Sequence, residues 1–208
     1  MRCEVLLYDG CDELDALAPW EVLSDVARAR DDVDAALVTL HGDAPIRASH
    51  GTVITPHRAL SEQVDLVVVP GGGWNDRSRT GAWTEVERGV LPEAIRARHE
   101  AGATVASVCT GAMLLAAAGL LTGRPAITHH VAIDDLKAAG AQVIHARVVD
   151  DGDVVTAGGV TSGLDLVLHL VERNWGAAVA LAAERELEYE RRGTVWRATN
   201  EDRRLAPA

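Results

Sequence analysis

Hydrophobic positions along this chain form short continuous runs that alternate with longer segments of helical period. Continuous runs rich in β-branched residues predict buried strands, because a strand covered on both faces has no polar side. Such runs occupy residues 3–8, 35–40, 66–69, 104–108, 143–149 and 154–157, with short extended pieces at 53–55 and 125–128. Helical periodicity occupies residues 15–30, 84–100, 110–118, 132–139, 162–174 and 177–191.

This alternation predicts an α/β fold: a doubly wound, mostly parallel sheet with helices on both faces. A tight turn at Asp151-Gly152 predicts that the last two strands form an antiparallel hairpin. No hydrophobic run reaches the roughly 20 residues that span a bilayer. We expect one domain over residues 1–190, followed by a charged extension over residues 191–208 that frays.

One cysteine stands where a predicted strand meets a predicted helix. Residues 103–121 read ATVASVCTGAMLLAAAGLL, so the strand stops at Cys109 and an alanine-rich helix follows. The small residues Ser107 and Gly111 flank it at the spacing of a nucleophile elbow. A helix N-terminus favours an anion, so we expect a lowered pKa and a nucleophilic thiolate. The alternative is a buried cysteine that acts only as a small hydrophobic residue.

The loop after the first strand supplies acids at the edge of the sheet where doubly wound proteins bind ligands. It contains Asp12, Glu13 and Asp15. We expect Asp12 and Glu13 to cap the helix that follows, where acids are favoured. Asp15 is followed by apolar residues, so it is the candidate acid for a pocket that contains the thiol. A carboxyl group there can relay a proton or activate water.

Two further segments supply candidate groups. The loop at residues 70–73, PGGG, brings the amides of Gly72 and Gly73, which with the amide of Thr110 can form an oxyanion hole. His129 and His130 follow the extended piece at 125–128, and at most one of them faces the thiol. A Cys–His pair would suit nucleophilic catalysis, so His129 is a further candidate. Adjacent histidines without spaced partners make a poor metal site, and we predict no metal.

Charge and cysteine content narrow the functional classes. The chain has 20 Lys and Arg against 31 Asp and Glu, a net charge of −11, with no basic block. Nucleic acid and anionic membranes are therefore not expected as partners, because phosphate contacts need clustered cations. The three cysteines do not form a disulfide framework, which fits a reducing cytoplasm. We expect Cys3 in the core and Cys11 in a partly exposed turn.

Four segments, taken in order, resemble the PfpI / Parkinson-protein superfamily, which has a class I glutamine-amidotransferase-like, flavodoxin-type fold. They read DELDALAPWEVL, VDLVVVPGGG, SVCTGAMLLAAAGLLTGRPAITHH and VVTAGGVTSGLDLVLHLVE. The resemblance implies a nucleophile at Cys109, a hydrogen-bonded pocket acid at Asp15 and an oxyanion hole around Gly72, Gly73 and Thr110. It also implies a homodimer that needs no cofactor.

Within that superfamily, Thr-Gly after the cysteine and an aspartate at position 15 look most like the isocyanide hydratase branch. That resemblance implies a small-molecule substrate, attacked by the Cys109 thiolate with Asp15 relaying a proton, and an N-substituted formamide as product. Thr110 would help to position the thiol. Two alternatives stay open: a glyoxalase or deglycase that uses Cys109 and His129, and a non-catalytic sensor based on oxidation of Cys109 or on ligand binding.

Overall fold

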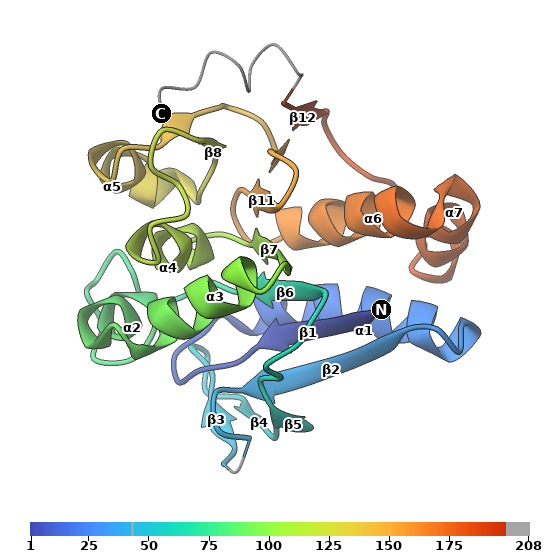
Figure 1. Ribbon diagram of the computed structural model, residues 1–208, viewed down its shortest axis with the longest axis horizontal. Coiled ribbons are helices and arrows are strands. Elements are labelled where there is room, and N and C mark those ends of the chain that lie inside the picture. Colours follow the sequence, from blue (N-terminus) through green and yellow to red (C-terminus); the bar gives the residue numbers. More distant parts are fainter. Residues whose placement is uncertain (43, 199–208) are drawn as a thin grey trace.

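A central sheet of eight strands forms the middle layer of the computed structural model, which describes residues 1–42 and 44–198 (Figure 1). The strand order is β12-β10-β11-β7-β6-β1-β2-β5. These strands are Arg2–Leu6 (β1), Asp34–Thr39 (β2), Arg58–Ala59 (β5), Leu66–Val69 (β6), Thr104–Ser107 (β7), Val148–Asp150 (β10), Val154–Ala157 (β11) and Val195–Arg197 (β12). Neighbours pair in parallel except β10 and β11. The predicted fold class is therefore confirmed, including the antiparallel hairpin.

Two small sheets stand outside this layer. Ile46–Arg47 (β3) and Val53–Ile54 (β4) form an antiparallel hairpin. Pro125–Ala126 (β8) pairs in parallel with Gln142–Val143 (β9). The first hairpin lies against the loop after β1, because the Gly10 amide donates to the Arg47 carbonyl at 2.8 Å.

Helices cover both faces of the central sheet (Figure 1). One group packs together on one face: Glu13–Ala29 (α1), Ser162–Trp175 (α6) and Ala177–Glu186 (α7). The other face carries Ala82–Arg88 (α2), Val90–Glu100 (α3) and Gly111–Ala117 (α4), with Ile133–Ala138 (α5) and the 3-10 helix His130–Ala132 beside α4. The apolar strands lie between the two groups, as a sheet buried on both faces requires.

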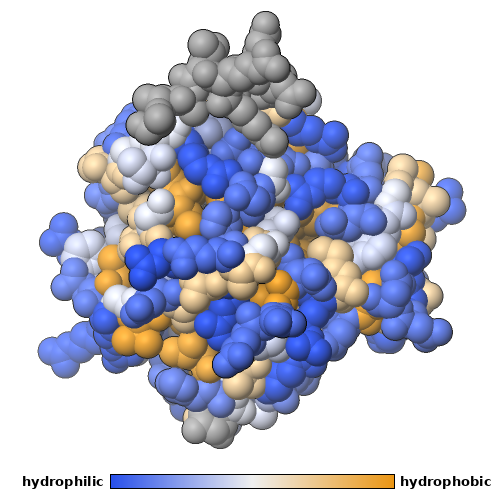
Figure 2. All heavy atoms as spheres, in the orientation of Figure 1, coloured by the Kyte–Doolittle hydropathy of each residue, from blue (hydrophilic) through white to orange (hydrophobic). Residues whose placement is uncertain are grey.

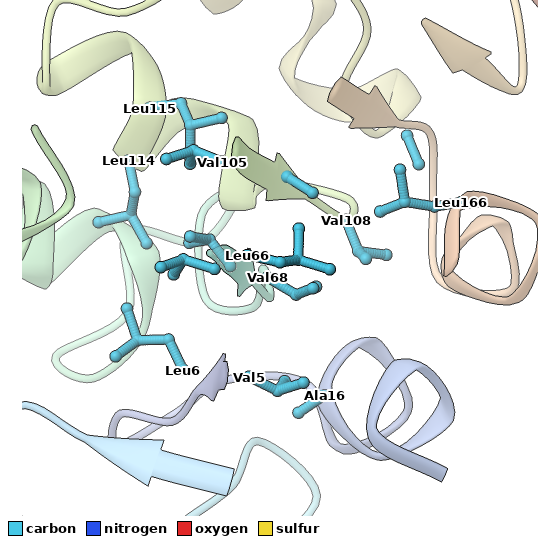
Figure 3. Packing of buried hydrophobic residues seen from close by; sticks show 14 of the residues in the cluster. Val5, Leu6, Ala16, Leu66, Val68, Val105, Val108, Leu114, Leu115 and Leu166 are labelled. Atoms are coloured by element: carbon cyan, nitrogen blue, oxygen red, sulfur yellow. The ribbon is translucent and has the colours of Figure 1, made fainter. Parts of the chain in front are cut away.

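The core therefore has two layers of side chains, one on each side of the sheet (Figure 3). Val5 points toward Ala16 of α1, whereas Leu114 of α4 lies on the opposite side of the strands. All four residues of β6 are buried. Each fully buried Val or Leu side chain contributes roughly 1.5–3 kcal/mol to stability.

Several predicted elements are divided in the structure. The helix expected at residues 84–100 is two helices, α2 and α3, because Gly89 adopts a φ of 74° that ends the first one. The strand expected at 143–149 is divided into β9 and β10, and the helix expected at 132–139 begins with the 3-10 turn. The prediction that residues 191–208 fray is wrong for β12, which pairs with β10; residues 199–208 lie outside the described residues.

The surface in the orientation of Figure 2 is mostly hydrophilic, with hydrophobic residues in several small groups. No helix in the described part of the chain combines the length and apolar character needed to cross a membrane.

Candidate active site

Cys109 lies at a sharp bend between β7, which ends at Ser107, and α4, which begins at Gly111. Its φ of 57° is in the left-handed region, a conformation that costs a non-glycine residue about 1–3 kcal/mol. Hydrogen bonds on both sides hold it there: the Cys109 amide donates to the Gly158 carbonyl at 2.8 Å, and the buried Thr128 hydroxyl donates to the Cys109 carbonyl at 2.9 Å. The bend is therefore imposed by the surrounding loops.

Two glycines allow the loop after β6 to touch this bend. A Cβ atom on Gly111 would lie 2.2 Å from the Val69 carbonyl oxygen. A Cβ atom on Gly71 would lie 2.5 Å from the Thr110 amide nitrogen. Any larger residue at either position would separate the loop from the bend.

Asp15 reaches the bend from the first turn of α1. The helix is capped by Asp12, whose carboxylate accepts from the amides of Leu14 and Asp15 at 3.0 and 3.4 Å, as predicted. Asp15 itself is fully buried, and its Oδ2 atom accepts from the Gly71 amide at 2.9 Å. Its other oxygen, Oδ1, is buried without a hydrogen-bond partner among the described residues.

This environment changes the acidity of Asp15. Burial raises its pKa to about 7, and the charge of Asp12 adds to the effect. The Gly71 amide and the Cys109 thiol act in the opposite direction by hydrogen bonding. Asp15 is therefore a carboxyl group beside the thiol that gains and loses its proton near neutral pH.

The thiol of Cys109 is less acidic than the sequence predicts. Burial raises its pKa to about 12, and the negative charge of Asp15 contributes in the same direction. The amides of Val160 and Thr110 lower it, but less than burial raises it. The prediction of a lowered pKa is wrong, because the side chain is almost fully buried and lies beside the carboxyl group of Asp15.

Of the three amides expected for the oxyanion hole, only that of Thr110 acts on the thiol among the described residues. The Gly72 amide donates to the Thr110 hydroxyl at 2.9 Å, so it joins the two loops instead of facing the thiol. Gly73 lines a separate cavity of about 640 Å³ beside the β3–β4 hairpin. The amides whose hydrogen bonding lowers the pKa of the Cys109 thiol are those of Thr110 and Val160. Sequence reasoning missed Val160, although the glycine pair that follows β11 was a usable signal.

His129 lies beside the bend without a hydrogen bond to the thiol among the described residues. Its Nδ1 atom accepts from the Val131 amide at 3.3 Å, so in the neutral ring the proton is on Nε2. Burial lowers the pKa of His129, and the neighbouring His130 adds to this effect. His129 lines a cavity of about 550 Å³ together with Thr128 and Val160, both of which contact Cys109.

Two predictions about the first loop are wrong. Glu13 does not cap α1, because its carboxylate accepts from the amides of His50 and Thr52. Burial opposes ionisation of Glu13, but these hydrogen bonds and that of the His50 side chain lower its pKa to about 2. Cys11 is fully buried, because the β3–β4 hairpin covers it and the Ser49 amide donates to its carbonyl. Cys3 lies in the core as predicted. No three His, Cys, Asp or Glu side chains in the described ranges are grouped to hold a metal ion.

A doubly wound sheet with a cysteine at a strand-to-helix bend and a buried acid beside it defines a class of α/β proteins. The chain belongs to the DJ-1/PfpI family, whose family model matches residues 1–173.

Individual relatives carry the names of different activities. The chain is 34% identical to an isonitrile hydratase of Pseudomonas putida over 88% of this chain and 76% of that protein. It is 29% identical to a deglycase of Thermococcus kodakarensis over 76% of this chain and 89% of that protein. A ThiJ/PfpI family protein from Pseudomonas syringae superposes with a TM-score of 0.81 at 27% identity, covering 91% and 75% of the two chains.

Proposed function

We propose that this protein is a cysteine-dependent hydratase that converts a small isocyanide into an N-substituted formamide. The observation that carries the proposal is the buried pair of Cys109 and Asp15, in which an acid of pKa about 7 lies beside a thiol that needs a base. Similarity to the isonitrile hydratase of P. putida supports the reaction.

In the first half of the reaction, Asp15 acts as a proton shuttle. Its carboxylate takes the proton from the Cys109 sulfur while the sulfur attacks the terminal carbon of the isocyanide. The same proton is then delivered to that carbon, which gives a thioimidate, R–N=CH–S–Cys109. Asp15 can make this transfer because its carboxyl group forms a hydrogen bond with the Cys109 thiol.

In the second half, water adds across the C=N bond, with its oxygen on carbon and one proton on nitrogen. The C–S bond then breaks, and its electron pair leaves with sulfur. The hydroxyl proton returns to sulfur through Asp15, and R–NH–CHO is released. The amides of Thr110 and Val160 stabilise the negative charge on sulfur in both halves, since charge-assisted hydrogen bonds strengthen as the charge develops.

The test is formamide production from an aryl isocyanide, followed by chromatography. We expect turnover by the wild-type protein and its loss in Cys109→Ala, whereas Cys11→Ala, which removes another fully buried thiol, retains activity. Formamide production no greater than that of Cys109→Ala would reject the hydratase proposal.

A glyoxalase or deglycase activity is the second candidate, because His129 lies in the neighbouring cavity and one relative is named as a deglycase. The Nδ1 hydrogen bond of His129 argues against it as a general base, since the remaining nitrogen carries the proton. Lactate production from methylglyoxal that disappears in His129→Ala would favour this candidate over the hydratase.

The proposal includes a homodimer. Sedimentation equilibrium at several protein concentrations tests it, and a molar mass of one chain at all of them would contradict it.

A further inference from the structure

The cavity of about 550 Å³ that His129 lines differs from the rest of the molecule in the charge of its side chains. It lies between the segment after β8 and the start of α6. Three of its lining residues contact Cys109: Thr128 donates to its carbonyl, Gly158 accepts from its amide, and the Val160 amide reaches its sulfur. Cys109 itself is not a lining residue, so the cavity flanks the thiol.

The cavity lining combines apolar side chains with imidazole and guanidinium groups and contains no acid. Its polar side chains include His129, His130, His145 and Arg147, and its lining contains neither Asp nor Glu. The whole chain has a net charge of −11, so a lining with one permanent cation and three imidazoles departs from the rest of the molecule. Within the lining itself the charged side chain is a cation, which favours an anionic ligand, while Asp165 behind Arg147 balances part of its charge.

Arg147 is held with part of its guanidinium group still available. Its Nε atom donates to Asp165, and its Nη2 atom donates to the Thr161 hydroxyl at 2.9 Å. Asp165 lies behind it, buried, and also accepts from the Tyr189 hydroxyl at 3.0 Å and the Arg192 amide at 2.6 Å. The guanidinium group also interacts with the Tyr189 hydroxyl, so the donors that remain for a ligand are those of its five N–H groups that Asp165, Thr161 and Tyr189 do not use.

His129 supplies a second donor in a fixed tautomer. Its Nδ1 atom accepts from the Val131 amide, which leaves the proton on Nε2. The ring lies against Gly159, where a Cβ atom would be 2.4 Å from His129 Cδ2, so the ring borders the cavity closely. Within residues 1–42 and 44–198, the acidic group whose charge raises the pKa of this imidazole is Asp12, which lies outside the cavity lining.

We propose that this cavity holds the substituent of the substrate and that it selects a carboxylate. The proposal rests on the hydratase function for the position of the reacting carbon. Arg147 and His129 would donate to the carboxylate, which is the group that matches a guanidinium fork. Ile127, Ile133 and Val160 line the cavity with apolar groups that suit a short aliphatic or aromatic spacer. Its volume is within the range of small-ligand pockets.

The experiment compares 4-isocyanobenzoate with 4-isocyanobenzamide, two substrates of matched size that differ in charge. For the wild-type protein we expect kcat/KM to be about 10-fold or more higher for the carboxylate. The double variant Arg147→Gln/Asp165→Asn removes the cation without leaving a buried charge, and its preference should fall to about onefold through KM. The matched control Arg28→Gln/Asp25→Asn, a surface ion pair on α1, should keep the preference.

A binding measurement separates this proposal from the hydratase proposal. Calorimetric titration of the Cys109→Ser protein with benzoate and with benzamide requires no turnover. Binding of benzoate alone, lost in the Arg147→Gln/Asp165→Asn background, would support the carboxylate site even if no isocyanide is hydrated. Equal kcat/KM for the two isocyanides, or no difference in binding between benzoate and benzamide, would overturn it.

Discussion

Two buried aspartates, Asp150 on a strand and Asp15 on a helix, have pKa values that are shifted in opposite directions. Asp150, at the end of β10, accepts from His169 Nε2 at 2.7 Å, from the Gly152 amide at 2.8 Å and from Arg173 Nη1 at 3.2 Å. Although burial opposes it, these partners hold its pKa below the ordinary value. Asp15 has one amide, one unpartnered oxygen and a pKa raised to about 7.

The comparison shows that burial alone does not decide the charge of an acid in this protein. Where the chain provides a histidine, an arginine and an amide, the carboxylate stays ionised and joins β10 to α6. Where the chain provides only one amide and a thiol, as at Asp15, the ionised carboxylate is only marginally stable, and the carboxyl group can exchange its proton at neutral pH. The first arrangement suits stability, and the second suits proton transfer.

The largest expected effect concerns the rate. Asp15→Asn keeps an oxygen that can accept from Gly71 but cannot take a proton from Cys109. We expect formamide production to fall by about 10²–10⁴-fold, the usual contribution of a positioned general base. Steady-state kcat/KM at pH 7.5 measures this, and a loss smaller than about fivefold would show that Asp15 is not the proton shuttle.

The next effect concerns stability at the other aspartate. Asp150→Ala removes the partner of the buried His169 and of the half-buried Arg173, and we expect the free energy of unfolding to fall by roughly 3–5 kcal/mol. Urea unfolding followed by circular dichroism measures it. The control is Asp134→Ala, an exposed acid on α5, with an expected change below about 0.5 kcal/mol. Equal losses of unfolding free energy in Asp150→Ala and Asp134→Ala would contradict a stabilising role for Asp150.

A third prediction concerns the pH dependence of stability. The pKa of Asp15 is about 7 in the folded protein and near 3.8 when unfolded, so the folded state holds the proton more tightly. The contribution of this group is therefore greatest below about pH 4 and is lost as the pH rises toward and through 7.

The Asp15→Asn variant shows this dependence directly. It should be more stable than the wild type at pH 8, by on the order of 2–4 kcal/mol, and about equally stable at pH 4. Urea denaturation midpoints at the two pH values test it. If the Asp15→Asn variant is less stable than the wild type at pH 8, that result would contradict the raised pKa.

The smallest expected effect concerns a positioning residue. Thr128→Val removes the hydrogen bond to the Cys109 carbonyl, and we expect a loss of about 1 kcal/mol in stability. The bend relaxes with it, so kcat should fall several-fold while Thr128→Ser restores it. The matched control is Thr39→Val, which removes a hydroxyl group that accepts from the Gly42 amide. Thr39 is on β2, outside the loops that contact Cys109, so this variant should lower stability without lowering kcat.

Much of the architecture was readable from local patterns, because β-branched runs and small residues around Cys109 are themselves the cause of the strand and the bend. The break at Gly89 was missed because the helical period continues across it. The contacts of Thr128 and Val160 were missed, since both residues reach Cys109 from distant segments, Thr128 through its hydroxyl group and Val160 through its amide. The prediction that the pKa of the thiol is lowered was wrong for a similar reason, because desolvation depends on which parts of the whole fold cover the sulfur.

The strand β12 has a consequence for how the protein avoids edge-to-edge pairing of its sheet with another molecule. It covers the outer side of β10, and the Ala198 amide donates to the Asp150 carbonyl at 2.9 Å. Removing it would expose a row of unsatisfied amides and carbonyls on β10, a template for strand exchange between molecules. With it in place, the sheet presents at this border a strand of only three residues, which offers a second chain little to pair with.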